Sequence, residues 1–312
     1  MPRPISTYSI VARDPEAGQF GVAVQSHYFS VGGIVPWAEA GVGAVATQSF
    51  AEASYGPLGL TLMRAGKTAT QALDGLLASD SQREGRQVAM IDAQGNVATH
   101  TGRKCVEAAG HRQGANYSVQ ANLMLRDTVW DAMAEAFETA EGDLADRLMA
   151  ALEAAEGEGG DIRGKQSAAL LVVGGERTGN PWMGRLLDLR VEDNPAPLPE
   201  LRRLIKISRA YHREDRLEAV LMDEAAPGKE LERIIREVRG DAEMMIELAG
   251  NPELLFWQGI AFVSAHRLED ALPLFQQLFS IDPTWRQLVP RMVKAELLPD
   301  DPHLLKAILE QN

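Results

Sequence analysis

Stretches in which polar and apolar residues alternate predict a strand-rich beginning of the chain. Residues 6–10 alternate within a stretch, 6–12, that a Pro-containing turn closes, and residues 20–25 follow with two valines on one face. A period of two residues is typical of strands with one buried face. The two stretches therefore predict a β-hairpin. A Gly-rich connection over residues 32–41 then leads to a third strand over residues 42–48.

Helical patterns with clear ends follow, and they come in pairs. Pro57 suits the first turn of a helix that Gly66 ends, and Thr68 with Gln71 forms a capping box at the start of the next helix. Helix pairs between antiparallel strands predict an α+β fold in which two packed sheets are covered by helices. The remaining elements expected are strands over 86–91, 96–100 and 117–121, helices over 129–137 and 144–152, and a last strand over 167–173.

A Pro-rich stretch divides the chain. Residues 193–199 hold three alternating prolines, which predict a stiff linker that excludes a helix. The expected first domain is therefore 1–192, and a helical domain is expected over 200–312. One tetratricopeptide-like helix pair is predicted there, and because a single unit cannot bury both its faces, neighbouring helices must cover it. Its pattern is carried by Leu255, Gly259, Phe262, Ala271, Phe275 and Pro283.

Charge and hydropathy narrow the choice of partners. The chain has 31 Lys and Arg residues against 44 Asp and Glu, a net charge of −13, and the parts before and after Pro195 are both acidic. Nucleic-acid binding needs a basic surface, so no nucleic-acid partner is expected. No apolar run approaches the about 18–20 residues of a membrane span, and residues 1–6 do not resemble a signal peptide. We therefore expect a cytoplasmic protein that does not enter a membrane.

The sequence gives little support for cofactor or metal chemistry. Cys105 is the single cysteine, which excludes an internal disulfide and a multi-cysteine metal site, and no neighbour that would activate its thiol is apparent. The histidines are scattered without ligand spacing. The glycines at 32–33 lack the dinucleotide fingerprint. We expect neither a metal nor a cofactor.

Several blocks, in one order, resemble the domain-of-unknown-function 1028 (DUF1028) family. That family is grouped with the N-terminal nucleophile hydrolases, so the resemblance implies a four-layer αββα sandwich. It also implies that residues 200–312 correspond to a C-terminal extension described as peptidoglycan-binding. The blocks cover roughly residues 6–193 and comprise TYSIVARD at 7–14, GVAV at 21–24, GVGAVATQ at 41–48, YGPLG at 55–59, RQV at 86–88, HTG at 100–102 and GGDIRGKQSAA at 159–169.

Thr7 matches the position at which that superfamily carries its nucleophile. There a Thr, Ser or Cys attacks an amide carbonyl while its own free α-amine acts as the base. The resemblance implies this role for Thr7, although residues 1–6 block its amine in the encoded chain. The alternative is a β-branched residue that simply suits a strand. Ser6, Ser9 and Ser26 are lesser candidates for the nucleophile.

Polar side chains elsewhere could complete such a site. Thr47 and Gln48 end an apolar strand and Asn122 follows another, so their polar groups could donate to an oxyanion or could cap a sheet edge. His100, at the end of a predicted hairpin, is expected to be structural.

A glycine-rich stretch gathers an acid, a guanidinium, an amide and a hydroxyl within seven residues. These are Asp161, Arg163, Gln166 and Ser167, and they are candidates for binding the substrate. Arg163 could clamp a carboxylate with two hydrogen bonds, and Asp161 could orient it or bind an ammonium. The alternative is an Asp161–Arg163 pair that only holds a glycine turn in place.

Two hypotheses for function follow. In the first, the protein hydrolyses an amide bond in a small amino-acid-like or peptide substrate, with Thr7 as nucleophile and Gln48 and Asn122 around the oxyanion. In the second, it is a non-catalytic binding protein that keeps the fold, and residues 200–312 bind a protein or peptidoglycan partner. A homo-oligomer is a further expectation, because sheet-sandwich hydrolases often associate through their helical layers.

Overall fold

A computed structural model gives the fold of the protein and describes residues 5–223 and 228–311. The fold mixes helices and antiparallel sheets, and the chain divides into two compact units. The first unit ends at Ile205 and the second begins at Lys206.

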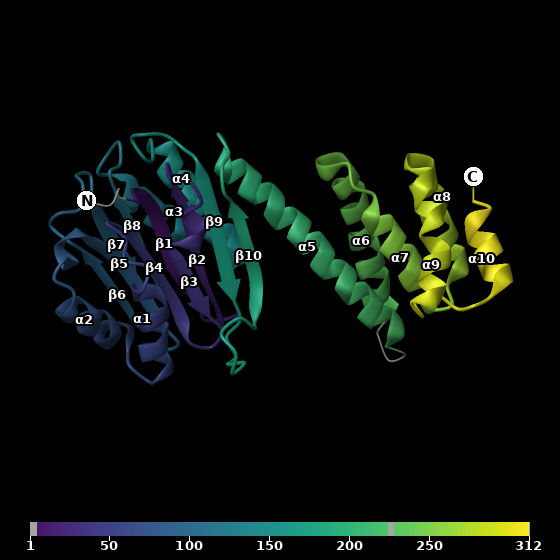
Figure 1. Ribbon diagram of the computed structural model, residues 1–312, viewed down its shortest axis with the longest axis horizontal. Coiled ribbons are helices and arrows are strands. Elements are labelled where there is room, and N and C mark those ends of the chain that lie inside the picture. The colour runs from purple at the N-terminus through teal and green to yellow at the C-terminus, as the bar shows by residue number, and fades with distance from the viewer. Residues whose placement is uncertain (1–4, 224–227, 312) are drawn as a thin grey trace. The chain divides into compact units, whose positions relative to one another are not determined.

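The first unit contains two antiparallel sheets (Figure 1). The larger has six strands in the order β10-β9-β2-β1-β8-β7, and the smaller has four in the order β3-β4-β5-β6. The larger sheet consists of Thr7–Asp14 (β1), Gln19–Ser26 (β2), Gly110–Gly114 (β7), Tyr117–Asn122 (β8), Ser167–Val173 (β9) and Arg185–Val191 (β10). The smaller consists of Pro36–Glu39 (β3), Gly43–Ser49 (β4), Arg86–Asp92 (β5) and Val97–Thr101 (β6).

Each sheet has a pair of helices on its outer face. Helices α1 (Tyr55–Arg64) and α2 (Ala69–Ser79) share a core with the outer side chains of β4 and β5. Helices α3 (Val129–Thr139) and α4 (Leu144–Gly157) share another with those of β1 and β8. The predicted capping box of α2 is confirmed, since the Thr68 hydroxyl accepts from the Gln71 N–H while the Gln71 side chain accepts from the Thr68 N–H.

The inner faces of the two sheets meet across a layer that changes character along the strands. Its apolar half consists of small and branched side chains that alternate with the outward-facing ones, as the period of two requires. The apolar half includes Val11, Val22, Val24, Ala44, Ala46, Ala89, Ile91, Ala169 and Leu171. Toward the start of β1 the inward side chains become polar, and the candidate site lies there.

Three strands have no counterpart in the sequence-based prediction. The statement that 167–173 is the last strand is wrong, because β10 pairs with β9 along its length. Strand β10 forms an edge of the sheet and carries charged side chains, so it lacks an apolar run. Strand β7 is polar, and β3 is only four residues long inside the Gly-rich connection.

The prediction that the prolines exclude a helix is also wrong. Helix α5 spans Pro197–Met222, so Pro197 and Pro199 lie in its first turn. Proline is tolerated there because the first N–H groups of a helix have no partner inside the helix. The division between the two compact units therefore falls within α5 and not in the Pro-rich stretch.

The second unit is helical and has its own core. Gly259 on α7 lies against Phe275 on α8, where a Cβ atom at residue 259 would meet the ring at 2.8 Å, so a small residue lets the two helices approach closely. Neighbouring helices contribute to the same core. No helix in the described part of the chain is long and apolar enough to cross a membrane. Beyond α5, the helices are Gly228–Ala249 (α6), Glu253–Ser264 (α7), Leu268–Ile281 (α8), Val289–Lys294 (α9) and Pro302–Leu309 (α10).

Candidate active site

Thr7 is the first residue of β1, in the middle of the larger sheet, and its side chain is completely buried. Strand pairing sets it beside Ser26 of β2 on one side and Asn122 of β8 on the other. The Thr7 hydroxyl donates to the carbonyl oxygen of Ile5 at 2.9 Å and lies 3.3 Å from the Ser26 hydroxyl oxygen. The Thr7 nitrogen belongs to the peptide bond with Ser6, so it is not an amine in this form.

The carbonyl oxygen of Ser6, in the peptide bond just before Thr7, accepts two side-chain hydrogen bonds. One comes from Arg163 Nη2 at 3.2 Å and the other from the Ser26 hydroxyl. Donors on a carbonyl oxygen stabilise the negative charge that develops there when a nucleophile attacks the carbon. The two donors therefore polarise the peptide bond whose cleavage would give Thr7 a free amine.

Arg163 is held by Asp161 through two parallel hydrogen bonds. Nε and Nη2 of Arg163 lie 3.0 and 2.7 Å from the two carboxylate oxygens, and the Asp161 side chain is fully buried. Asp161 also accepts from the backbone N–H of His27 at 3.1 Å. Glycine at residue 164 has a φ of 108°, a conformation that other residues rarely adopt. The predicted pair thus exists, and it directs the guanidinium at Ser6.

The same loop is anchored from the outer face of the sheet. The Tyr8 hydroxyl donates to Glu156 Oε2 at 2.6 Å, and Lys165 Nζ lies 2.6 Å from Glu156 Oε1. Burial, with a further contribution from the Glu156 carboxylate, raises the pKa of Tyr8 well above its usual value. Tyr8 therefore remains a hydrogen-bond donor and positions the end of α4, from which the loop starts.

Between the sheets lies a group of buried polar side chains, the amide cluster, which consists of Ser9, Gln48, Gln87, Gln120 and Asn122. Gln87 Oε1 accepts from Gln48 Nε2 at 2.7 Å and from Asn122 Nδ2 at 2.9 Å. The Ser9 hydroxyl donates to Gln48 Oε1 and accepts from Gln120 Nε2, and both distances are 2.6 Å. Since a buried polar group without a partner costs about 1–3 kcal/mol, such a network is stable only when its members satisfy one another.

The amide cluster contacts the backbone of the nucleophile candidate, not its hydroxyl. Gln48 Nε2 lies 3.3 Å from the Thr7 carbonyl oxygen and 3.2 Å from that of Gln120. Its two hydrogens are therefore already engaged. Asn122 Oδ1 is buried without a hydrogen-bond partner in the described part of the chain.

The amide cluster leads toward a surface pocket of about 540 Å³ at the β6 edge. Gln87 Nε2 donates to Thr101 Oγ1 at 3.0 Å, and that oxygen lies 2.9 Å from Nδ1 of His111. Burial, and to a smaller extent His100, lowers the pKa of His111. Thr101 also lines the pocket, together with residues such as Arg103 and Trp130.

Two of the predicted substrate-binding residues hold other parts of the first unit together. Ser167 donates to the carbonyl oxygen of Tyr28 and accepts from the N–H of Val31 at 3.2 Å. Gln166 Nε2 lies 3.1 Å from Asp193 Oδ1. The structure brings the guanidinium of Arg163, held by Asp161, to the Ser6 carbonyl, whereas the side chains of Gln166 and Ser167 make the other contacts just given.

The remaining candidates have plain structural contacts. His100 Nε2 lies 2.9 Å from the carbonyl oxygen of Arg83. Thr47 lies on the opposite face of β4 from Gln48 and contacts the Glu52 carbonyl at 3.2 Å. Cys105 is buried, and burial raises the pKa of its thiol. In the described ranges no group of three or more His, Cys, Asp or Glu side chains is arranged to hold a metal ion.

Sequence reasoning missed Gln87 and Gln120, although a signal was present for Gln87. In β5, Gln87 shares the inward face with Ala89 and Ile91. The alternation of the strand therefore predicts an apolar residue at position 87, and a glutamine stands there instead. Ser9 likewise shares the inward face of β1 with the apolar Val11, whereas Gln120 lies on a face of β8 that is polar throughout, so no break in the alternation marks it. Ser26, a lesser candidate from the sequence, is the residue that joins Thr7 to the Ser6 carbonyl.

The residues before Thr7 tie the two sheets together. Ile5 and Ser49 exchange two backbone hydrogen bonds, with N–O distances of 2.7 and 3.0 Å. Ile5 directly extends β1 of the larger sheet, whereas Ser49 ends β4 of the smaller one. Ser49 has a φ of 68°, which is unusual for a buried non-glycine residue. Ile5 thus joins the end of β4 to the start of β1 at the polar end of the inter-sheet layer.

The first unit is thus defined by two antiparallel sheets that pack face to face, with buried polar side chains around the first residue of a central strand. Comparison with known proteins places this chain in a family. The chain belongs to DUF1028, a family of unknown function, whose sequence pattern matches residues 7–201. It is similar to protein SPO2555 from Silicibacter pomeroyi, a DUF1028 protein of known crystal structure. The two are 32% identical, with a TM-score of 0.57 over 64% of this chain and 88% of that one. No curated protein matches the chain.

Proposed function

We propose that the first unit is an N-terminal nucleophile hydrolase that cleaves an amide bond in a small amino-acid-like or peptide substrate. In this proposal its layers form the four-layer αββα sandwich of that superfamily. The helix pairs on the outer faces of two facing sheets support this assignment. So does the position of Thr7 at the start of a central strand.

The observation that carries the proposal is the double hydrogen bond to the Ser6 carbonyl oxygen. Arg163 and Ser26 both donate to it, and the hydroxyl oxygen of the next residue, Thr7, lies 3.3 Å from that of Ser26. A threonine that follows a polarised carbonyl is suited to attack it. The arrangement therefore supports removal of the leading residues by the protein itself.

The cleavage step balances as follows. Thr7 Oγ1 attacks the Ser6 carbonyl carbon, the Ser6 carbon–Thr7 nitrogen bond breaks, and the hydroxyl proton ends on the nitrogen. The resulting ester is hydrolysed by water, which leaves a carboxylate on Ser6 and a free α-amine on Thr7. That amine then serves as the base for Thr7 Oγ1 in attack on a substrate amide.

The same donors then serve the substrate. Loss of residues 1–6 opens the space that Ile5 and Ser6 occupy, and a substrate carbonyl placed there meets Arg163 and Ser26 as its oxyanion donors. Asp161 keeps the guanidinium oriented. Gln48 and Asn122, which were expected at the oxyanion, act in this proposal by joining β1 and its neighbour β8 to the smaller sheet.

Intact-mass measurement on the purified full chain tests this proposal. We expect a species that begins at Thr7, whereas a Thr7→Val variant keeps its leading residues because it has no hydroxyl. Thr7→Ser is the matched control, since it retains the nucleophile and is expected to be cleaved. Cleaved protein is then screened on a panel of aminoacyl and γ-glutamyl amides. A leader that stays intact in the wild type, together with no turnover, would contradict the proposal.

One observation favours the alternative of a non-catalytic binding protein. Thr7 is completely buried, its nitrogen is in a peptide bond, and its hydroxyl already donates to Ile5. In that case residues 200–312 provide the interaction with a protein or with peptidoglycan. Co-sedimentation of the full chain with purified peptidoglycan, with the leader intact, is the result that this alternative predicts.

A further inference from the structure

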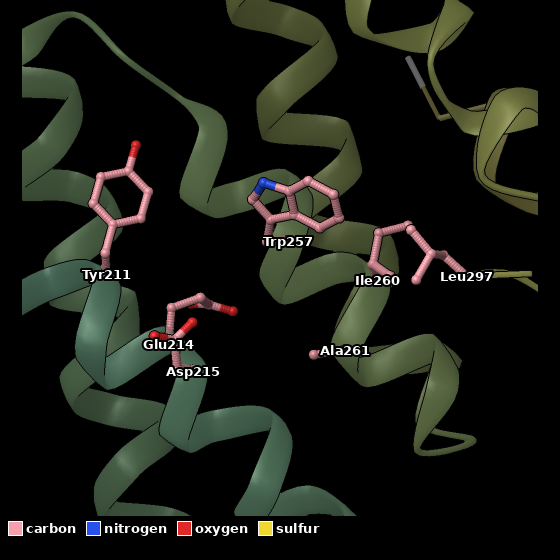
Figure 2. A pocket seen from close by; sticks show the side chains of 7 residues that line it. All are labelled: Tyr211, Glu214, Asp215, Trp257, Ile260, Ala261 and Leu297. Atoms are coloured by element: carbon pink, nitrogen blue, oxygen red, sulfur yellow. The ribbon is translucent and has the colours of Figure 1, made fainter. Parts of the chain in front are cut away.

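A pocket of about 240 Å³ lies within the second unit, between α5 and α7 (Figure 2). It is smaller than the roughly 300–1,000 Å³ typical of sites for drug-sized ligands, so it suits a small group. Two aromatic rings and two carboxylates stand around it, and apolar side chains complete it. The lining residues are Tyr211, Glu214, Asp215, Trp257, Ile260, Ala261 and Leu297.

The two aromatic rings are held by one carboxylate. Glu253 accepts from the Tyr211 hydroxyl at 2.9 Å and from the indole N–H of Trp257 at 3.2 Å. Burial alone would raise the pKa of Glu253, but hydrogen bonds from Trp257, Tyr211 and Asn251 outweigh it and lower the pKa. Glu253 therefore remains an ionised acceptor. Because the polar edges of both rings are fixed, their orientation at the pocket is fixed as well.

The acidic side chains come from α5, three and four residues after Tyr211. This spacing sets Glu214 and Asp215 on the same side of the helix as the tyrosine, and Figure 2 shows them next to it. Glu214 is only 8% exposed, whereas Asp215 is exposed. Residues 206–312 hold 19 acidic and 13 basic residues, so the unit as a whole also favours cations.

We infer that this pocket binds an organic ammonium group, either of a free amine or of a lysine side chain. Aromatic faces attract cations, with Trp the strongest, and the attraction grows as the cation loses its water. Carboxylates beside the rings add charge attraction and give the ammonium hydrogen-bond or ion-pair partners. The apolar wall formed by Ile260, Ala261 and Leu297 covers the carbon atoms next to the charge. This inference is independent of the proposed hydrolase activity.

Calorimetric titration of the full chain with choline and with 3,3-dimethyl-1-butanol tests the inference, because the two share a shape and differ in charge. We expect choline to bind about fivefold more tightly or better. A second arm compares Nα-acetyl-lysine methylamide with its norleucine analogue and distinguishes a side-chain ligand from a free amine. Equal affinity for the charged and the neutral member of both pairs would overturn the inference, as would no binding of either cation at millimolar concentration.

Variants locate the binding. Asp215→Asn removes an exposed charge without changing shape, and it is expected to weaken binding of the cation about three- to tenfold while leaving the neutral analogue unaffected. Trp257→Leu is expected to weaken it further, with thermal unfolding as the check that the unit remains folded. Glu269→Gln, an exposed carboxylate outside the pocket, is the matched control and should bind as the wild type does. If Glu269→Gln and Asp215→Asn weakened binding of the cation equally, the overall charge of the protein would explain the effect, and the inference that this pocket is the binding site would be overturned.

Discussion

The two halves of the layer between the sheets solve the same packing problem in opposite ways. The apolar half is filled with alanine and branched side chains, which need no partners. The polar half buries Thr7 and the amide cluster equally completely, so nearly every donor and acceptor there must be matched. The difference teaches that a buried layer tolerates polar side chains when they satisfy one another, and here their hydrogen bonds also hold the backbone of β1 and β8 next to Thr7.

The largest expected effect tests the apolar half. Ile91→Ala removes a fully buried side chain and leaves a cavity between the sheets, so we expect the free energy of unfolding to fall by about 2–5 kcal/mol. Urea denaturation measures this. Leu58→Ala, at a side chain that is 48% exposed, is the control and should change stability far less. Similar losses for the two variants would mean that the layer is not a packed core.

The next prediction tests the polar half at Gln87, which accepts hydrogen bonds from two other members of the amide cluster. Gln87→Met keeps the length of the side chain but removes the acceptor of Asn122 Nδ2, and we expect a loss of about 1–3 kcal/mol. The double variant Gln87→Met/Asn122→Leu removes both partners and should recover part of that loss. If the two single changes simply add in the double variant, the amide cluster does not act as a network.

A third prediction concerns the contribution of one ion pair, Asp80 with Arg86, to the stability of the first unit. Burial alone would raise the pKa of Asp80, but hydrogen bonds from Arg86 and from the Gln82 N–H outweigh it, so the pKa is lowered. A carboxyl whose pKa is lowered by folding stabilises the folded state fully at a pH above its unfolded-state pKa of about 3.9. This stabilisation is lost as the pH falls through the pKa of the carboxyl in the folded state.

We therefore expect the stability of the wild type to fall more steeply below about pH 4 than that of Asp80→Asn, measured by denaturation at a series of pH values. At pH 7 this variant should lose less stability than Ile91→Ala, because the amide oxygen of asparagine still accepts from Arg86. Parallel curves for wild type and variant in acid would show that the Asp80–Arg86 pair does not carry the acid sensitivity.

The smallest expected effect on stability is at Thr7 itself. In Thr7→Val the Ile5 carbonyl oxygen keeps the hydrogen bond from the Ser49 N–H, so no acceptor is abandoned there, and we expect a change of no more than about 1 kcal/mol. The same variant abolishes cleavage if the proposed function is correct. A large loss of stability would instead favour a purely structural role for the threonine.

The sequence predicted those elements whose signals are local. Alternation identified β1 and β2, an apolar run after the Gly-rich connection identified β4, and the Thr68 capping box located the start of α2. Edge strands such as β7 and β10 escaped because their neighbours, not their own residues, make them strands. Proline in the first turn of α5 shows that a residue disfavoured inside a helix can still begin one.

The candidate site divides in the same way. The pairing of Asp161 with Arg163 lies within three residues and followed from the sequence. The meeting of Arg163 and Ser26 at the Ser6 carbonyl depends on strand register and on a loop from a distant part of the chain. No local pattern contains that information, so the sequence could not predict that Ser26 donates to this carbonyl.

The backbone bridge between Ile5 and Ser49 offers a test of the proposed cleavage before Thr7 that needs no substrate. In the intact chain the Ser49 amide is buried and bonded to the Ile5 carbonyl, so its hydrogen is shielded from solvent. Cleavage before Thr7 would take Ile5 away and leave that amide without its acceptor. Deuterium uptake at the end of β4 should then accelerate, and a latent protein and its active form would be told apart by the solvent access of a single peptide group.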